Sequence, residues 1–292
     1  MASFNEARRL GIGGSDVAAI MGLSPWKTPL NIYFEKVRGD TVHDDKNLVR
    51  GRQLEKYILE DYADRNDVEL DTSSSFVQSA EFPFLIGNID AKVKNKNVLV
   101  EAKSAKFRSS DWDGLPIYYR TQVAHYAMIT DCDYVDIAVV FLQPWDYQCF
   151  RYNRDLAFEK KMKDTCVQFW EGNVLKNIPP NPENPDDARS LFSISTEKSQ
   201  KATETVKKAV EEIKKIHLLQ DRLLKKEDDL KLAIMTEMQD AQTLLDDNIP
   251  IVTWKTQISK RIDSARLKKE NPVIFSEFLK ESSSRVFRIK GE

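Results

Sequence analysis

The chain has 292 residues, of which 41% are hydrophobic and 31% are charged, and its formal net charge at pH 7 is −2. This composition excludes a fully disordered chain and a fibre, and it is typical of a globular protein. A chain of nearly balanced charge is not coated with positive charge, so any surface that binds nucleic acid has to be local. No segment approaches the roughly 18 apolar residues of a membrane-spanning helix, so we expect a cytoplasmic protein without membrane contact.

The three cysteines, Cys132, Cys149 and Cys166, are odd in number, and none belongs to a Cys-x-x-Cys pair. Neither a disulfide framework nor a four-thiolate metal cluster is therefore expected. This pattern fits a reducing compartment.

A proline-rich stretch divides the chain. Four prolines lie within residues 177–187. Each removes a backbone donor and disfavours helix at the preceding residue, which predicts an extended linker. We therefore expect a first domain over residues 1–178, a linker over 179–195 and a second region over 196–292.

The first domain begins with helical patterns. Residues 15–21 and 29–37 predict short helices. A longer helix is predicted over residues 48–65, because apolar residues there recur at three- and four-residue spacing.

A β signature follows. Residues 84–93 and 98–103 are rich in β-branched residues, and the polar segment 94–97 between them predicts a hairpin. A helix is expected over residues 118–130. Residues 134–142 form the most apolar strand, which predicts an interior position in the sheet.

The second region reads mainly as one long helix. The following apolar residues recur there at helical spacing, with charged residues on the other faces: Val206, Val210, Ile213, Ile216, Leu219, Leu223, Leu230, Ile234 and Met238. This pattern is typical of a helical hairpin or a coiled-coil arm. Short strands over 250–255 and 285–290, and a helix over 271–279, are expected after it.

Chemistry is indicated at the hairpin. Asp90 ends one predicted strand, and Glu101 and Lys103 lie on the next. Because strand side chains alternate, Glu101 and Lys103 share one face, and the hairpin can bring Asp90 opposite that face. The alternative is an exposed hairpin with solvated charges, but the apolar segment 98–100 favours a buried strand.

Such a cluster suits phosphodiester hydrolysis. Two carboxylates can hold one or two Mg²⁺ ions, which polarise a phosphate and activate a water. Lys103 would orient or deprotonate that water, with its pKa lowered by the cation and by partial burial.

Basic residues surround the hairpin. Against the single acid Glu101, residues 91–108 hold six cations: Lys92, Lys94, Lys96, Lys103, Lys106 and Arg108. They form a local surface for phosphate contacts, although Lys94 and Lys96 read equally well as a solvated hairpin tip. The aromatic residues Trp26, Trp112 and Tyr118 can stack on frayed bases or belong to the core. His125 is expected to be structural.

Several blocks resemble one family. Residues 9–29, Gly51-Arg-Gln-Leu-Glu55, Gly87-Asn-Ile-Asp90, Val100-Glu-Ala-Lys103 and Thr121-Gln-Val-Ala-His-Tyr126 stand in the order found in YqaJ-type phage recombinase nucleases. Those proteins belong with the lambda-type alkaline exonucleases. The resemblance implies an α/β, restriction-endonuclease-like PD-(D/E)xK core, with a mixed central sheet flanked by helices. A mainly helical C-terminal region would follow this nuclease domain. One departure is Asn88-Ile89 before Asp90, where Ser-Pro is common.

The resemblance also implies roles for individual residues. Asp90, Glu101 and the Ala102 carbonyl would bind metal, and Lys103 would position or activate the water. Glu55 would support a second metal or the first.

Three further roles concern DNA. Gln122 would orient the metal site or the nucleic acid. Arg9 and Ser15 would bind the 5′ phosphate, with Lys106 and Arg108 as further DNA contacts. Gly13-Gly14-Ser15 before a helix offers N–H groups to an anion, which is compatible with an ordinary N-cap.

By this resemblance the chain is expected to be an exonuclease that uses Mg²⁺, with Mn²⁺ as a substitute. It would resect double-stranded DNA ends from 5′ to 3′ for recombination by single-strand annealing, together with an annealing protein. A ring-shaped homo-oligomer, a trimer by analogy, is implied, working in the bacterial host cytoplasm if the gene is phage-borne. Two alternatives stay open: a structure- or site-specific endonuclease on the same fold, and a non-catalytic DNA-binding scaffold.

Overall fold

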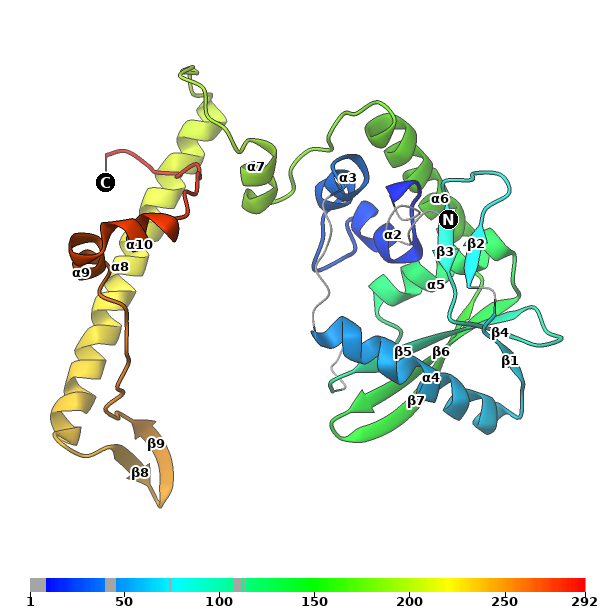
Figure 1. Ribbon diagram of the computed structural model, residues 1–292, viewed down its shortest axis with the longest axis horizontal. Coiled ribbons are helices and arrows are strands. Elements are labelled where there is room, and N and C mark those ends of the chain that lie inside the picture. Colours follow the sequence, from blue (N-terminus) through cyan, green and yellow to red (C-terminus); the bar gives the residue numbers. More distant parts are fainter. Residues whose placement is uncertain (1–8, 40–45, 74, 108–111, 113, 292) are drawn as a thin grey trace. The chain divides into compact units, whose positions relative to one another are not determined.

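The computed structural model describes residues 9–39, 46–73, 75–107, 112 and 114–291 (Figure 1). Its contacts divide the chain into two compact units, Met1–Leu191 and Phe192–Glu292. None of the helices in the described ranges is long and apolar enough to cross a membrane.

A mixed sheet forms the centre of the first unit (Figure 1). Its five strands have the order β1 (Leu70–Asp71), β4 (Ala91–Val93), β5 (Val98–Ala105), β6 (Tyr134–Leu142) and β7 (Trp145–Asn153). β5 and β6 are parallel and the other neighbours are antiparallel. Helix α5 (Ile117–Thr130) connects the parallel pair, as a crossover must. The predicted mixed α/β class and the interior position of β6 are confirmed.

Alternation along the strands gives the sheet two buried faces. On β5, Leu99 belongs to a core shared with α2 (Gly14–Ile20), α5 and α6 (Leu156–Phe169). Val98 and Val100 point the other way, into a smaller core against α4 (Lys46–Asn66). Because Glu101 and Lys103 follow Leu99 at spacings of two, they are directed to the α5 side.

Local signals explain the first helices. The Thr28 hydroxyl accepts a hydrogen bond from the Asn31 amide at the start of α3 (Pro29–Val37), and Pro29 occupies the first helical position. In α2 the Asp16 carboxylate accepts from the Gly13 amide. The observed bounds of α2, α3 and α4 lie within two residues of those expected from the sequence.

The first strand of the predicted hairpin is broken. Its early part is β3 (Ile86–Asn88), which pairs with β2 (Phe76–Gln78) in a separate two-stranded sheet, and only β4 pairs with β5. The break falls at Ile89 and Asp90. Ile89 is buried in the larger core, and the Asp90 carboxylate takes the place of a strand partner by accepting from the Ala102 amide.

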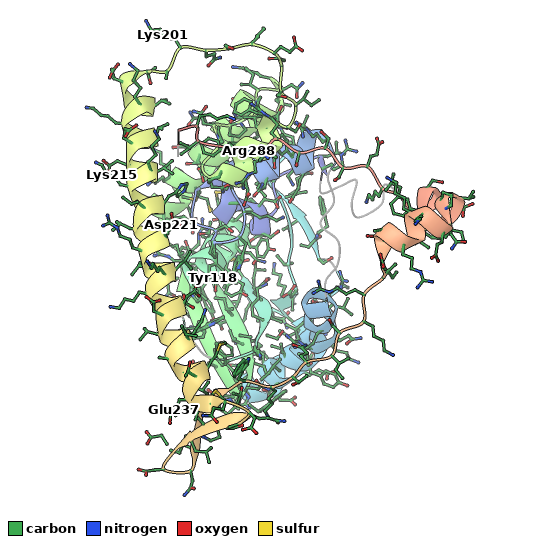
Figure 2. The ribbon with its side chains drawn as sticks, turned by 90° about the vertical axis from the view of Figure 1, so that its left-hand side faces the viewer. Tyr118, Lys201, Lys215, Asp221, Glu237 and Arg288 are labelled. Carbon is green, nitrogen blue, oxygen red and sulfur yellow. The ribbon has the colours of Figure 1, made fainter. Side chains whose placement is uncertain are left out.

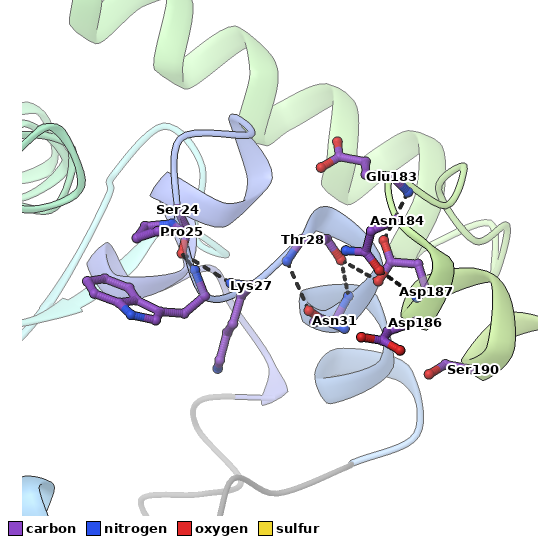
Figure 3. A pocket seen from close by; sticks show the side chains of 11 residues that line it. Ser24, Pro25, Lys27, Thr28, Asn31, Glu183, Asn184, Asp186, Asp187 and Ser190 are labelled. Atoms are coloured by element: carbon purple, nitrogen blue, oxygen red, sulfur yellow. Dashed lines mark hydrogen bonds between the residues drawn. The ribbon is translucent and has the colours of Figure 1, made fainter. Parts of the chain in front are cut away.

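The expected linker also differs from the structure. Residues 179–195 contain helix α7 (Pro185–Leu191), so the first unit extends thirteen residues past the expected limit of 178. Asp187 is buried and accepts from the Thr28 hydroxyl at 2.9 Å and from the Glu183 amide at 3.0 Å (Figure 3). Proline at the first position of a helix favours the helix, and this effect outweighs the proline content of the stretch.

The second unit contains the predicted long helix, α8 (Glu204–Met238, 35 residues). Figure 2 shows side chains projecting along its whole length, among them Lys215, Asp221 and Glu237. A hairpin of β8 (Thr243–Asp246) and β9 (Ile249–Thr253) follows, then α9 (Ser264–Glu270) and α10 (Pro272–Glu277). The prediction of a strand over residues 285–290 is wrong, because these residues form no ladder with another strand of the described ranges. The Arg285 side chain instead donates a hydrogen bond to the Phe192 carbonyl oxygen.

Candidate active site

Asp90, Glu101 and Lys103 meet at the start of β4, where the antiparallel β5 continues beyond it. The Lys103 ammonium lies 2.5 Å from Glu101 Oε1, and Glu101 is only 2% exposed. Asp90 Oδ2 accepts from the Ala102 amide at 2.8 Å. The structure therefore brings the three residues together, with the two carboxyl groups on adjacent segments of backbone.

The Ala102 carbonyl faces the same edge of β5. The last β4–β5 pair is Ala91 with Val100, so β4 does not extend alongside Ala102. The N–H and C=O of one strand residue point to the same side, and the Ala102 N–H points to Asp90. The Ala102 carbonyl oxygen is thus directed to the edge that holds the Asp90 carboxylate.

Gln122 on α5 contacts the same cluster. Its amide nitrogen donates to Glu101 Oε1 at 2.7 Å and to the Tyr126 hydroxyl at 3.0 Å. Tyr126 stands one helical turn after Gln122 and is 5% exposed. The sequence analysis gave Gln122 a role but overlooked Tyr126, although its spacing of four from Gln122 was a usable signal.

Two glycines make room for the Tyr126 ring. A Cβ at Gly14 would lie 2.6 Å from Tyr126 Cε1, and a Cβ at Gly87 would lie 2.9 Å from the same atom. Such approaches are closer than carbon atoms allow, so only glycine fits at either position. Gly14 and Gly87 therefore determine where the Tyr126 ring lies, and the Tyr126 hydroxyl holds the Gln122 side chain through a hydrogen bond.

The carboxyl groups are crowded in a setting of low polarity. Burial, together with the Asp90 charge, raises the pKa of Glu101 to about 8, although Lys103 acts against this. Burial also raises the pKa of Asp90. Glu55, half-buried on α4, has a pKa raised by burial and by the Asp90 charge, which places it near the cluster. All three carboxyl groups therefore favour a compensating cation.

Lys103 differs from expectation. Burial alone would lower its pKa, but the charges of Glu101 and Asp90 outweigh burial and raise the pKa of Lys103. The expected depression of this pKa is wrong for the protein without metal. Lys103 is a cation at neutral pH and a donor to Glu101, and it also lies 5.4 Å from the centre of the Tyr119 ring.

The residues fit a hard divalent cation. The Glu101 Oε2 atom is buried and has no hydrogen-bond partner among the described residues. In the same described ranges, no three His, Cys, Asp or Glu side chains gather into a complete metal site. The chain itself would supply Asp90, Glu101 and the Ala102 carbonyl, and Mg²⁺ commonly fills its remaining positions with water and substrate oxygens.

The predicted phosphate ligands are placed unequally. Ser15 is exposed, and its neighbour Gly14 lies against Gln122, since a Cβ there would be 3.1 Å from Gln122 Cγ. The start of α2 already holds an internal carboxylate, because Asp16 accepts from Gly13 and pairs with the buried Lys36 at 2.6 Å.

The other predicted DNA contacts lie on the surface or outside the described residues. The exposed Arg9 lies beside Gly39, whose Cβ would be 3.1 Å from the guanidinium carbon. Lys106 is exposed just beyond β5. Arg108 lies outside the described residues. Lys94 pairs with Glu69 at 2.8 Å, both exposed, which favours the solvated reading of the hairpin tip.

His125 has a structural setting. It is fully buried, and its Nε2 atom lies 2.8 Å from the Ile86 carbonyl oxygen. Burial lowers the pKa of His125 to about 4, so the ring is neutral and can donate to that carbonyl.

Known proteins are similar to this chain in sequence and in fold. The family model described as the YqaJ-like viral recombinase domain matches residues 3–133. The uncharacterized protein YqaJ of Bacillus subtilis (strain 168) is 24% identical over 294 residues, which cover 97% of this chain and 92% of that protein.

Solved structures show the same architecture. The alkaline exonuclease LHK-Exo from Laribacter hongkongensis matches with a TM-score of 0.51 and 16% identity, covering 61% of this chain and 94% of that chain. LHK-Exo in complex with dAMP matches with a TM-score of 0.50 and 15% identity, covering 64% and 96%. Residues 3–133 therefore resemble the YqaJ-like viral recombinase domain, and the chain shares its fold, a mixed sheet flanked by helices, with an alkaline exonuclease.

Proposed function

We propose that this chain is a Mg²⁺-dependent deoxyribonuclease that removes nucleotides from the ends of double-stranded DNA. The observation that carries the proposal is the buried Glu101 carboxyl group, whose Oε1 atom accepts from Lys103, whose Oε2 atom accepts from no donor of the described residues, and which interacts directly with the Asp90 carboxyl group. A structural ion pair would use both carboxylate oxygens, whereas this one leaves an oxygen for a ligand. The fold shared with an alkaline exonuclease supports the same activity.

The chain's own residues have distinct tasks in hydrolysis. Asp90, Glu101 and the Ala102 carbonyl would hold the cation, which would supply Lewis-acid chemistry toward the phosphate and the attacking water. Lys103, being protonated, donates hydrogen bonds toward the attacking water and the charge that develops on phosphate oxygens. Gln122 holds the Glu101 carboxylate in place through Oε1, and Tyr126 holds Gln122.

Glu55 is proposed as a further ligand or as a support for ligand waters. It is half-buried, and its charge interacts with those of Asp90 and Lys103. Arg9, Ser15 and Lys106 are proposed to bind DNA phosphate, and Gly14, the neighbour of Ser15, lies against Gln122. Arg108 stays a prediction from the sequence.

The direction, partner and assembly extend the proposal. We propose digestion from 5′ to 3′, leaving a strand for a single-strand annealing protein, as suits a viral recombinase domain. A homo-oligomeric ring, a trimer by analogy, would keep the enzyme on DNA. The exposed apolar side chains of α8, such as Leu219 and Leu223, give a surface for subunit or partner contacts.

The test uses linear duplexes with 5′-phosphate or 5′-hydroxyl ends, in Mg²⁺, Mn²⁺ or EDTA. Wild type and the control Lys160→Ala, an exposed lysine of α6, should release nucleotides with either metal, faster from phosphorylated ends. Lys103→Ala should lose about 100-fold or more in rate. Equal cutting of closed circular DNA would replace this proposal with an endonuclease, and binding without cutting would leave a scaffold.

A further inference from the structure

An exposed tryptophan stands near the cluster and takes no part in the function proposed above. Trp26, in the loop between α2 and α3, is 69% exposed. Its ring meets the partly exposed Tyr118 ring edge-on, with centroids 4.6 Å apart. A large aromatic surface held open to solvent by a second ring is a setting in which a flat ligand can stack.

The aromatic contacts continue to the catalytic lysine. Tyr118 meets Tyr119 edge-on at 4.6 Å, and the Tyr119 ring centre lies 5.4 Å from the Lys103 ammonium. Trp26 is therefore only three short contacts from Lys103. One strand of B-DNA advances 3.4 Å per nucleotide, so a base on Trp26 would belong to one of the first four or so nucleotides beside the scissile phosphate.

The charge around Trp26 favours a base over the sugar–phosphate chain. Trp26 also borders a cavity of about 370 Å³ beside α7. The carboxyl groups of Glu183 and Asp186 line that cavity (Figure 3). Lys27 also lines it, but its ammonium is paired with Glu35 at 2.6 Å. Carboxylates repel phosphate but accept hydrogen bonds from the amino groups of bases. The backbone is thus directed toward Lys103 and the base toward Trp26.

We propose that Trp26, backed by Tyr118, is a stacking platform for a nucleobase of the bound DNA strand within about four nucleotides of the scissile phosphate. Stacking on a ring is tolerant of sequence, which suits an enzyme that digests any end. The platform orients the strand so that its backbone reaches the Asp90–Glu101–Lys103 cluster. This inference rests on the proposed nuclease function.

The experiment is a double-mutant cycle between protein and DNA. Single abasic nucleotides are placed at each of the first four positions on either side of the cleaved bond, and kcat/KM is measured for wild type, Trp26→Ala and Trp26→Phe. Trp26→Ala should lose about tenfold on intact DNA, and Trp26→Phe should recover most of the loss. At one position, the abasic site should slow wild type by a similar factor yet leave Trp26→Ala unchanged.

Trp145→Ala is the matched control. Trp145 is 70% exposed and pairs with Leu142, which packs toward the α4 face of the sheet, away from the face of Lys103. It should leave both intact and abasic DNA unaffected. Thermal unfolding of each variant shows that the fold is retained.

Equal abasic effects in wild type and Trp26→Ala at every position would overturn the platform. The platform would also be overturned if Trp26→Ala changed only the oligomeric state, because Trp26 would then contact another protein chain rather than DNA. If wild type cuts no DNA, the nuclease proposal fails separately. In that case the affinity for the same abasic series is measured by fluorescence anisotropy in EDTA. We expect the effects of Trp26→Ala and of the abasic site on affinity to be non-additive at one position. Additive effects at every position would overturn the platform.

Discussion

At the residue scale, the cluster combines a buried carboxyl group with an ammonium that cannot neutralise it fully. Glu101 accepts from both Lys103 and Gln122 through Oε1, while Oε2 stays unpartnered among the described residues. Burial and the Asp90 charge raise the pKa of Glu101 to about 8. Residues held in such a setting cost stability in the free protein, as is common at functional sites.

The substitution Glu101→Gln should therefore stabilise the protein when metal is absent. A raised folded pKa contributes stability below the unfolded pKa of about 4.5, and this contribution is lost as pH rises through about 8. Glutamine stays neutral throughout. In EDTA at pH 9 we expect Glu101→Gln to raise the free energy of unfolding by about 1–3 kcal/mol, and by less at pH 5.

Urea unfolding of both proteins at the two pH values measures this difference. A variant that is equally stable or less stable at pH 9 would show that Glu101 carries no such strain. Activity should fall in the same variant, since glutamine binds Mg²⁺ weakly.

His125 predicts the opposite pH dependence. Its folded pKa is lowered to about 4 by burial, so its contribution to stability is present above the unfolded value of about 6.5 and is lost as pH falls toward 4. Between pH 7 and pH 4.5, wild type should lose up to about 3 kcal/mol relative to His125→Gln. Parallel stability curves for the two proteins over this range would contradict the assignment.

At the scale of elements, α2 and α5 position the site by packing closely across Gly14. The ring of Tyr126 occupies the space that a side chain at Gly14 would need, and Tyr126 holds Gln122 by a hydrogen bond. The packing of α2 against α5 therefore sets the orientation of the Glu101 carboxylate, because Gln122 donates a hydrogen bond to it.

Gly14→Ala should disturb both stability and activity. Its Cβ would lie 2.6 Å from the Tyr126 ring, and the overlap should cost about 1–3 kcal/mol and reduce cleavage. Gly51→Ala is the matched control. Among the described residues, no atom outside the helix's own backbone lies within 4 Å of a Cβ at Gly51, inside α4, so alanine there should stabilise by about 0.5–1 kcal/mol. Equal effects of the two substitutions on thermal unfolding would refute this packing argument.

At the scale of the whole molecule, α7 decides where the first unit ends. Asp187 is buried against Thr28, and Leu191 packs on the larger core. The second unit has a different character, because its 35-residue helix buries only Met238 among its described residues. Because most helical stability in proteins comes from packing of an apolar face, α8 has little of this stabilisation within its own unit.

Two truncated chains distinguish a first unit that ends at Leu191 from one that ends at residue 178. A chain ending at Leu191 should unfold cooperatively and keep its nuclease activity, whereas a chain ending at Ile178 loses the contacts of Asp187 and Leu191. We expect the shorter chain to be less stable by about 2–4 kcal/mol, or several degrees in Tm. Calorimetry measures both, and indistinguishable Tm values would restore the earlier boundary at 178.

The sequence by itself determined the order of the elements, the mixed α/β class and the identity of the acidic and basic cluster. Apolar periodicity, caps and the family blocks are local signals, and most of the helices and strands of the first unit depend on them. The break at Ile89–Asp90, the docking of α7 and the role of Tyr126 were decided by tertiary structure. Each depends on a contact between distant segments: Asp90 with Ala102, Asp187 with Thr28, and Tyr126 with Gly14 and Gly87. The raised pKa of Lys103 belongs with them, because the balance between burial and two neighbouring charges exists only once the chain is folded.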